Sequence, residues 1–354
     1  MVKISGDMLE GGGQIIRTSI ALAALLGEEV EIINVRGKRS PPGLKAQHIT
    51  GVKAVAAVSE AEVEGLEIGS KRLRFKPRSR RGGAFTFNIG TAGSISLVLQ
   101  ALMPAAAFTS TPLEARITGG TDVRWSPTID YVRMVTLPIL AKMGYKAELK
   151  VERRGHYPRG GGFVTFRAFP IRGLNPITLE EGGAVTKIDG RSHCVRLPSH
   201  VAERQAKAAS RLLRDAGFRD VQVETEWYPP EKDPHLGPGS GITLCAITST
   251  GSILGADAIG ERGKPAEKVG EEAASKLLED IKTGMALDRH MSDIIIPYIA
   301  VAEGRSRITV SQLTLHTMTN IKVTETIART QFKVQGELNK PGRIEVDGIG
   351  LILQ

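Results

Sequence analysis

The chain has 354 residues, of which 41% are hydrophobic and 24% are charged. This length predicts about two domains, and the composition excludes a chain that is disordered throughout. Lys and Arg outnumber Asp and Glu by 47 to 38, and the resulting net charge of +9 favours an anionic partner, either nucleic acid or a nucleotide. No apolar run reaches the roughly 18 residues that span a bilayer, so we expect no membrane partner.

Two cysteines, Cys194 and Cys245, are present without metal-type spacing. They indicate neither a disulfide framework nor a zinc site. The first residues also lack the apolar core of a signal peptide. Together these features predict a reducing, cytoplasmic location.

Basic side chains are concentrated in the stretch KRLRFKPRSRR, residues 71–81. Such a run is either a solvated hairpin or loop, or a grip on a phosphate backbone, and the sequence leaves both readings open. Aromatic residues make up only 5% of the chain, which does not favour a base-stacking platform.

Taken in chain order, the apolar periodicity predicts a unit of strand, helix, strand, helix and two strands that then recurs. The first unit comprises the strand MVKIS, a glycine turn and helix at 10–27, a strand at 29–37, a helix at 43–59, and strands near 61–66 and 71–75. The second comprises a strand at 84–90, a glycine turn and helix at 90–107, a strand at 113–122, a helix at 126–144, and strands at 145–151 and 161–169. Ser126 is the predicted N-cap of its helix, with Pro127 at the first helical position.

A more degenerate third copy fits residues 287–354, with a strand at 307–314 and a helix after Asn320. Residues 184–282 follow another pattern between glycine-containing seams, and we interpret them as a small inserted domain. The predicted division is 1–183 for the first two repeats, 184–282 for the inserted α/β domain, and 283–354 for the third repeat. The predicted fold class is α/β (α+β).

Three glycines stand directly before a helix in the stretch EGGGQIIR, residues 10–17. The free N–H groups of a helix N-terminus suit an anion, and Arg17 could add positive charge. Glu10 would repel a bare phosphate but suits a Mg²⁺ ion carried with a nucleotide. A tight strand-to-helix turn is the alternative reading, and no Walker A pattern is present.

A rigid basic loop, RGKRSPPGLKAQH, occupies residues 36–48. Its arginines Arg36 and Arg39 could bind phosphate bidentately, although a solvated basic loop is an equal alternative. Farther on, the stretch SQLTLHTMTNIKV holds His316 in a partly alternating pattern. The segment alone leaves two roles open for His316, a packed strand residue or a nucleophile presented at the end of a strand.

Seven segments in order resemble the RNA 3'-terminal phosphate cyclase family over nearly the whole chain. They are EGGGQIIRTSIALA, RGKRSPPGLKAQH, GTAGSISLVLQALMP, GGTDVRWSP, GHYPRGGG, HVAER and LTLHTMTN. The resemblance implies a large domain of three βαβαββ repeats, each similar to the C-terminal domain of a bacterial translation initiation factor, and a small inserted α/β domain. It also implies ATP-dependent conversion of an RNA 3'-phosphate into a 2',3'-cyclic phosphate.

The same resemblance assigns roles to single residues. His316 matches the nucleophile that attacks the α-phosphorus of ATP, and Glu10 matches the acidic residue at the nucleotide-bound metal, Mg²⁺ or Mn²⁺. The remaining nucleotide and phosphate contacts implied by the resemblance are Arg17, Arg36, Arg39, Gln47, Gln100 and the loop His290, Met291, Ser292, Asp293 and Ile294. Relatives often carry Tyr and Gln where this chain has His290 and Ile294, so backbone contacts to adenine are the alternative there.

The implied partners are ATP and an RNA with a 3'-phosphate end, and a homodimer is left open. Three other classes of function are alternatives to the cyclase. They are a non-catalytic scaffold of ribosome biogenesis on the same fold, a carboxyvinyl transferase on a related repeat fold, and a plain RNA-binding module. His316 argues against the scaffold, because those relatives lack the nucleophilic histidine.

Overall fold

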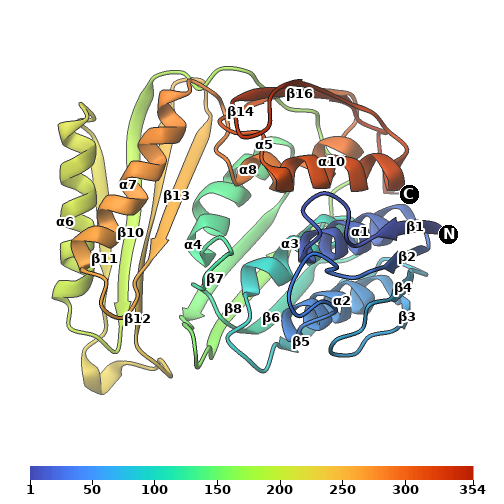
Figure 1. Ribbon diagram of the computed structural model, residues 1–354, viewed down its shortest axis with the longest axis horizontal. Coiled ribbons are helices and arrows are strands. Elements are labelled where there is room, and N and C mark those ends of the chain that lie inside the picture. Colours follow the sequence, from blue (N-terminus) through green and yellow to red (C-terminus); the bar gives the residue numbers. More distant parts are fainter. Residues whose placement is uncertain (354) are drawn as a thin grey trace.

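The computed structural model describes residues 1–353 and shows a mixed α/β protein, as the sequence predicts. Four four-stranded sheets carry the helices (Figure 1). The first sheet and its helices are β1 (Val2–Ser5), α1 (Gly13–Leu26), β2 (Val30–Ile33), α2 (Ala46–Ser59), β3 (Glu62–Glu64) and β4 (Leu73–Lys76). The second group is β5 (Gly83–Asn88), α3 (Ile95–Ala106), β6 (Leu113–Gly119), α4 (Ile129–Tyr131), a π-helical turn (Val132–Thr136), α5 (Leu137–Lys142), β7 (Ala147–Arg153) and β8 (Gly162–Ala168).

The third group brings together two separate parts of the chain. It consists of β9 (Thr178–Leu179), α8 (Met291–Ile294), α9 (Ile296–Val301), β14 (Arg305–Val310), α10 (Leu315–Ala328), β15 (Phe332–Gly336) and β16 (Gly342–Asp347). All three sheets share one strand order, first–second–fourth–third, with the first pair parallel and the others antiparallel. The strand β9 was not predicted. Because it pairs with β14, the third sheet begins before residue 183 rather than after the insert.

Residues 185–282 form a fourth sheet with its own apolar core. Its elements are β10 (Val185–Val195), α6 (His200–Asp215), β11 (Val221–Glu226), a 3₁₀ turn (Pro230–Lys232), β12 (Gly239–Thr248), β13 (Ile253–Ile259) and α7 (Ala266–Lys282). The strand β13 was not predicted. Helices α6 and α7 pack together on the outer side of this sheet, at the left of Figure 1. Gly182 N–H donates to Gly284 O at 2.8 Å, so the chain leaves and re-enters the larger part at one point.

The larger part buries its helices between its sheets in one continuous apolar core. Helix α1 packs against both α3 and α10, although α1 and α10 are about 300 residues apart in the chain. The N-terminal ends of α1 and α10 meet where Glu10 N–H donates to Thr319 Oγ1 at 3.2 Å. Two segments that the sequence treats separately therefore share one site.

Two predicted helix starts differ from the structure: that of the helix after β6, and that of α10, which begins at Leu315 rather than after Asn320. Thr128, not Ser126, caps the helix after β6, because its side chain accepts from Tyr131 N at 3.2 Å. Pro138 follows in the same helix and has no N–H to continue the regular hydrogen-bond pattern, and a π-helical turn precedes it.

Within residues 1–353, no helix combines the length and apolar character needed to cross a membrane.

Candidate active site

His316 lies in the first turn of α10, not at the end of a strand as the alternation suggested. Thr314 caps the helix, because its hydroxyl accepts from Thr317 N at 3.0 Å. The run of hydroxyl-bearing residues that resembled one face of a strand therefore supplies a helix N-cap. The imidazole of His316 remains accessible to solvent at the rim of the site.

Gln14 of α1 fixes the orientation of the His316 ring. Its carboxamide N–H₂ donates to Asp293 Oδ2 at 2.8 Å and to the His316 carbonyl at 3.1 Å. The Gln14 amide oxygen is therefore turned towards His316 and accepts a hydrogen bond from its Nδ1. Because Nδ1 carries the proton in this arrangement, the lone pair lies on Nε2.

The surroundings of His316 also keep its ring unprotonated. Partial burial, together with the positive charges of Arg17 and Arg39, lowers the pKa of His316 to about 4. Asp293 behaves in the opposite sense, since burial raises the pKa of its carboxyl to about 6, partly offset by His290 and Arg17. At neutral pH the site thus presents a neutral imidazole beside cationic side chains, a combination that suits attack on an anionic phosphorus centre.

The glycine turn at residues 11–13 brings two side chains onto the start of α1. A Cβ on Gly12 would lie 2.4 Å from a Glu10 carboxylate oxygen, and one on Gly13 would lie 2.2 Å from His48 Nε2. Glycine is required here because polar side chains pack directly against the backbone. Glu10 is buried and pairs with Arg39 through one carboxylate oxygen, whereas its Oε2 has no hydrogen-bond partner.

The two arginines of the basic loop have different environments. Arg36 is buried, and its Nη1 donates to the carbonyls of Pro41 and Gly43 at 2.9 and 2.8 Å. Arg36 thus holds the loop in shape, and burial lowers the pKa of its guanidinium. Arg39 is half-exposed and reaches Glu10, so Arg39 is the better placed of the two to contact a ligand.

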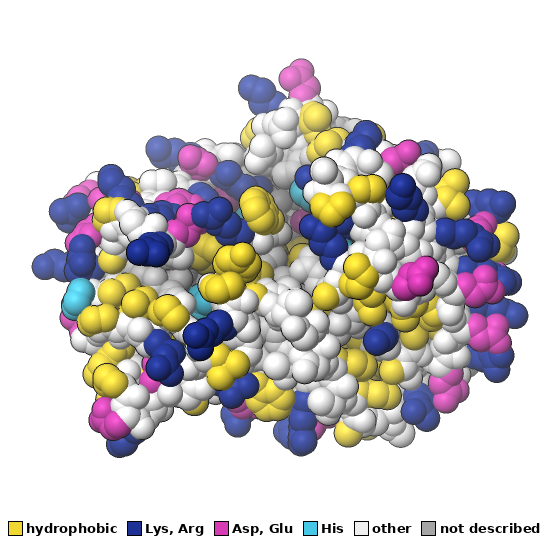
Figure 2. Space-filling model, turned by 60° about the horizontal axis from the view of Figure 1, so that its bottom comes forward, with side chains coloured by type: hydrophobic (Ala, Val, Ile, Leu, Met, Phe, Trp, Pro, Cys, Tyr) yellow, Lys and Arg dark blue, Asp and Glu magenta, His cyan; other side chains and the backbone are white. Residues whose placement is uncertain are grey.

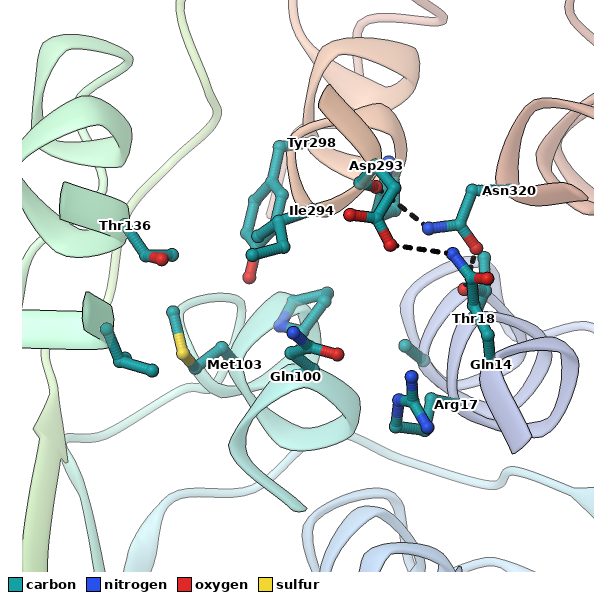
Figure 3. Close-up of a pocket in the computed structure, with 14 residues that line it drawn as sticks. Gln14, Arg17, Thr18, Gln100, Met103, Thr136, Asp293, Ile294, Tyr298 and Asn320 are labelled. Carbon is teal, nitrogen blue, oxygen red and sulfur yellow. Dashed lines mark hydrogen bonds between the residues drawn. The ribbon is translucent and has the colours of Figure 1, made fainter. Parts of the chain in front are cut away.

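A cavity lies next to Gln14 and Asp293, between α1, α3, α9 and the π-helical turn (Figure 3). The space between its walls, including the part open to solvent, is about 500 Å³, and the part that the centre of a water-sized molecule can occupy is about 30 Å³. Its walls are apolar on one side and polar on the other, as a site for a flat heterocycle with polar substituents requires. The lining residues include Arg17, Gln100, Met103, Pro104, Asp293, Ile294, Pro297, Tyr298 and Asn320.

The segment 290–294 contributes to this cavity unevenly. Ile294 forms part of the apolar wall through its side chain, whereas the family resemblance had left backbone contacts as the alternative at this position. The His290 ring instead lies edge-on to Tyr131, with ring centroids 5.8 Å apart. Met291 and Ser292 are fully buried, and Ser292 Oγ lies 2.7 Å from Thr317 Oγ1, which ties the segment to the first turn of α10.

Gln100 and Gln47 have different neighbours. Gln100 lines the cavity from α3. Gln47 is not among the cavity residues, and its amide oxygen accepts from Ser94 N at 3.1 Å. Gln47 therefore joins the start of α2 to the glycine turn that begins α3.

The chain is similar to known proteins over most of its length. A family model described as RNA 3'-terminal phosphate cyclase matches residues 8–334. A curated protein of that name from Ignicoccus hospitalis is 53% identical over 350 residues, which cover 99% of each chain. Proteins of the same name from Hyperthermus butylicus and Methanopyrus kandleri are 54% and 49% identical, over 99% and 98% of this chain and 98% of each of theirs.

The chain belongs to the RNA 3'-terminal phosphate cyclase family.

Several residues of this site were not predicted from the sequence. Gln14, His48 and Asn320 lie inside quoted segments but were given no role. Asn320 Nδ2 donates to the Asp293 carbonyl at 2.8 Å, while its Oδ1 accepts from Thr18 at 2.6 Å. Of these three residues, only Gln14 had a recognisable signal in the sequence. It is a polar residue directly after the glycine run, at the start of a mostly apolar helix.

The basic run at 71–81 is not a free cationic strip in this family member. Arg72 pairs with Glu31 and Arg74 with Glu29, both at 2.6 Å. Arg78 pairs with Glu62 as well. On the face shown in Figure 2, basic side chains are likewise spread among acidic ones. These ion pairs agree with the solvated-hairpin reading of this run.

Proposed function

We propose that the chain uses ATP to convert an RNA 3'-terminal phosphate into a 2',3'-cyclic phosphate through a covalent adenylate on His316. The family membership supports an RNA 3'-phosphate as the substrate. The observation that carries the proposed mechanism is the hydrogen-bond chain from Asp293 through Gln14 to His316 Nδ1, because it leaves the lone pair on Nε2.

In the first step, His316 Nε2 forms a bond to the α-phosphorus of ATP, and the bond from that phosphorus to the bridging oxygen breaks. Pyrophosphate leaves, and AMP is held on the histidine as a phosphoramidate. No base is needed to remove a proton from Nε2, since the ring is already neutral there at pH 7. Gln14 then stabilises the positive charge that the ring acquires, by accepting from Nδ1.

In the second step, an oxygen of the RNA 3'-phosphate attacks the same phosphorus and displaces His316. The terminal phosphate now carries AMP, which is a far better leaving group than an oxide. In the third step, the neighbouring 2'-hydroxyl attacks the RNA phosphorus and AMP departs. The ribose itself holds the hydroxyl near its target, so ring closure benefits from proximity.

The cavity beside Gln14 supports ATP as the nucleotide. Its apolar wall of Met103, Pro104 and Ile294 suits the faces of a purine, while Gln100 and Asp293 offer polar groups for its edge and ribose. Arg17 lies on the same side of this cavity as Gln14 (Figure 3), its charge acts on His316, and it would face the α-phosphate.

The residues present fit a divalent metal at Glu10. One carboxylate oxygen of this buried side chain is paired with Arg39, and the other has no partner. Mg²⁺ binds readily through a single carboxylate together with substrate phosphates, and when bound it would offset phosphate charge. Glu10 would hold the ion, and Arg39 would remain beside it as a phosphate contact.

Adenylation with ATP labelled at the α-phosphate tests the proposal. Wild type should acquire label that acid removes and mild alkali does not. His316→Asn should not, whereas His200→Asn, at an exposed position on α6, should label as wild type does. Uptake of label by His316→Asn, or mapping of AMP to a lysine, would refute the histidine mechanism. Tight RNA binding without any labelling would favour the scaffold function.

We also propose a cytoplasmic location, in agreement with the two free, buried cysteines.

A further inference from the structure

A second group of chemically active side chains lies where the inserted sheet meets the larger part. Asp122 lies in the loop after β6, His156 in the loop after β7, and His193 in β10 of the insert. All three side chains are more than nine-tenths buried. The proposed cyclase mechanism uses none of them.

The three side chains converge on one point. His156 Nε2 and His193 Nε2 are 3.1 Å apart, and His193 Nε2 is 3.8 Å from Asp122 Oδ2. One ligand-type atom from each residue lies within 4.8 Å of the others. Neighbouring ligands of a tetrahedral zinc ion at 2.0–2.1 Å are separated by roughly 3.3 Å, so the two imidazole nitrogens are already at ligand spacing, and Asp122 would have to move inwards by at most about 1.5 Å.

The opposite strand is shaped to accommodate both rings. A Cβ on Gly239 of β12 would lie 2.0 Å from the His156 ring, and one on Gly241 would lie 2.9 Å from His193 Cε1. Two glycines at alternate positions of one strand therefore leave room for two imidazoles.

The Asp122 carboxylate belongs to a cluster of charges in which Arg133 also pairs with Asp130 and Arg191 with Glu226. Arg154 is buried among three carboxylates, and it lies 2.6 Å from Asp130, 2.8 Å from Glu226 and 3.4 Å from Asp122. Because its contact with Arg154 is the longest of the three, the Asp122 carboxylate is the one whose charge Arg154 neutralises least. Its Oδ2, which is 3.8 Å from His193, accepts from Thr121 Oγ1 at 2.6 Å, whereas its Oδ1 is buried without a hydrogen-bond partner and is the oxygen left for a further cation.

We propose that Asp122, His156 and His193 bind a divalent cation of the zinc type, which links the inserted sheet to the larger part of the molecule. Imidazole nitrogen with one carboxylate is a donor set that zinc prefers and that Mg²⁺ does not. The cysteine count excludes a thiolate zinc site but has no bearing on one made of imidazoles. The ion is distinct from the metal at Glu10, and this proposal does not rest on the proposed function.

The simpler reading of the same geometry is a hydrogen bond between two neutral imidazoles. In that arrangement one ring donates through Nε2, and neither Nδ1 has a partner. Such a pair would not bind zinc stoichiometrically, and its stability would not depend on metal. The two readings therefore differ in a direct binding measurement.

The experiment uses the full-length chain carrying Glu10→Ala, which removes the proposed nucleotide metal. The protein is stripped with a chelator and titrated with Zn²⁺, with Co²⁺ absorption reporting the ligand geometry. We expect one Zn²⁺ per chain and a rise in melting temperature on binding. His193→Gln and the near-isosteric Asp122→Asn should each weaken Zn²⁺ binding by more than about 100-fold, since loss of a ligand exceeds the loss of an outer partner.

His200→Gln is the matched control, because His200 lies on the same inserted unit but is exposed, and it should leave binding unchanged. Should His193→Gln fail to fold, Asp122→Asn decides the question, since it keeps the side chain's shape and removes only its charge. Absence of saturable Zn²⁺ binding by the parent protein would overturn the proposal. Parent-like binding by Asp122→Asn would overturn it as well.

Discussion

Replacing Gln14 with methionine tests whether the orientation of His316, rather than its mere presence, controls adenylation. Gln14→Met keeps the length and approximate volume of the side chain but removes three hydrogen bonds, those to Asp293 Oδ2, the His316 carbonyl and His316 Nδ1. The ring then loses the acceptor that selects the Nδ1–H tautomer. It also loses the group that stabilises the charged ring after attack.

The size of the effect follows from the single bond to the ring. Removing the partner of one part-buried hydrogen bond costs about 1–3 kcal/mol, which corresponds to about a 5- to 150-fold slower step if the bond acts in the transition state. Single-turnover adenylation with α-labelled ATP measures this step alone. Gln14→Glu is the matched comparison: it keeps an acceptor for Nδ1, but its second oxygen would face Asp293 Oδ2 and the His316 carbonyl, where Gln14 has a donor.

Gln14→Glu also makes a distinct prediction about pH. A carboxylate beside the ring would raise the pKa of His316 above its present value of about 4, so the acid limb of the adenylation rate should move to higher pH. Wild-type single-turnover rates in Gln14→Met would refute the orienting role. An acid limb that does not move in Gln14→Glu would show that the glutamate does not contact the ring.

Four further outcomes follow. Glu10→Ala should slow adenylation at limiting metal and recover partly as Mg²⁺ or Mn²⁺ is raised; equal rates at limiting metal would exclude Glu10 as a ligand. Arg39→Ala should impair adenylation or transfer to RNA with an unchanged melting temperature, whereas Arg36→Ala should lower the melting temperature because two loop carbonyls lose their donor. Gly13→Ala should displace His48 and lower stability by about 1–3 kcal/mol in chemical denaturation, while Ala24→Gly, in the interior of α1, should cost only about 1 kcal/mol. Burial and nearby cations lower the pKa of His48 in the folded chain to about 3. As the pH falls below about 6.5, His48 is therefore protonated in the unfolded chain but not in the folded one, and the stability that His48 contributes is lost. The difference in melting temperature between wild type and His48→Asn should therefore narrow from pH 7 to pH 5. A difference that stays constant would contradict the lowered pKa of His48.

Local patterns were sufficient for most helices and strands. The glycine turns before α1 and α3 and the paired strands β7 and β8 follow from the spacing of glycine and apolar residues, which acts over a few residues. Predictions failed where a longer context decides. The strand β9 has only two residues and is recognisable only from its pairing with β14, and β13 carries Asp257 in its middle, which weakens the apolar pattern.

His316 shows the same limit within the site. Its hydroxyl-rich surroundings alternate in part, as in a strand, yet Thr314 uses its hydroxyl to cap a helix that begins one residue later. Both structures satisfy the local pattern. Packing of α10 against α1 selects the helix, because only a helix buries Thr317, Ile321 and Thr324 together.

The sequence by itself determined the fold class and the family, because both depend on residue types in a given order. Tertiary structure alone decided which nitrogen of His316 is free, since Gln14 is 302 residues away and reaches the ring only when α1 and α10 pack side by side. It also decided that Arg36 supports its loop while Arg39 faces Glu10. Hydrogen-bond partners from distant segments are set by the packing of whole helices, and no local spacing encodes them.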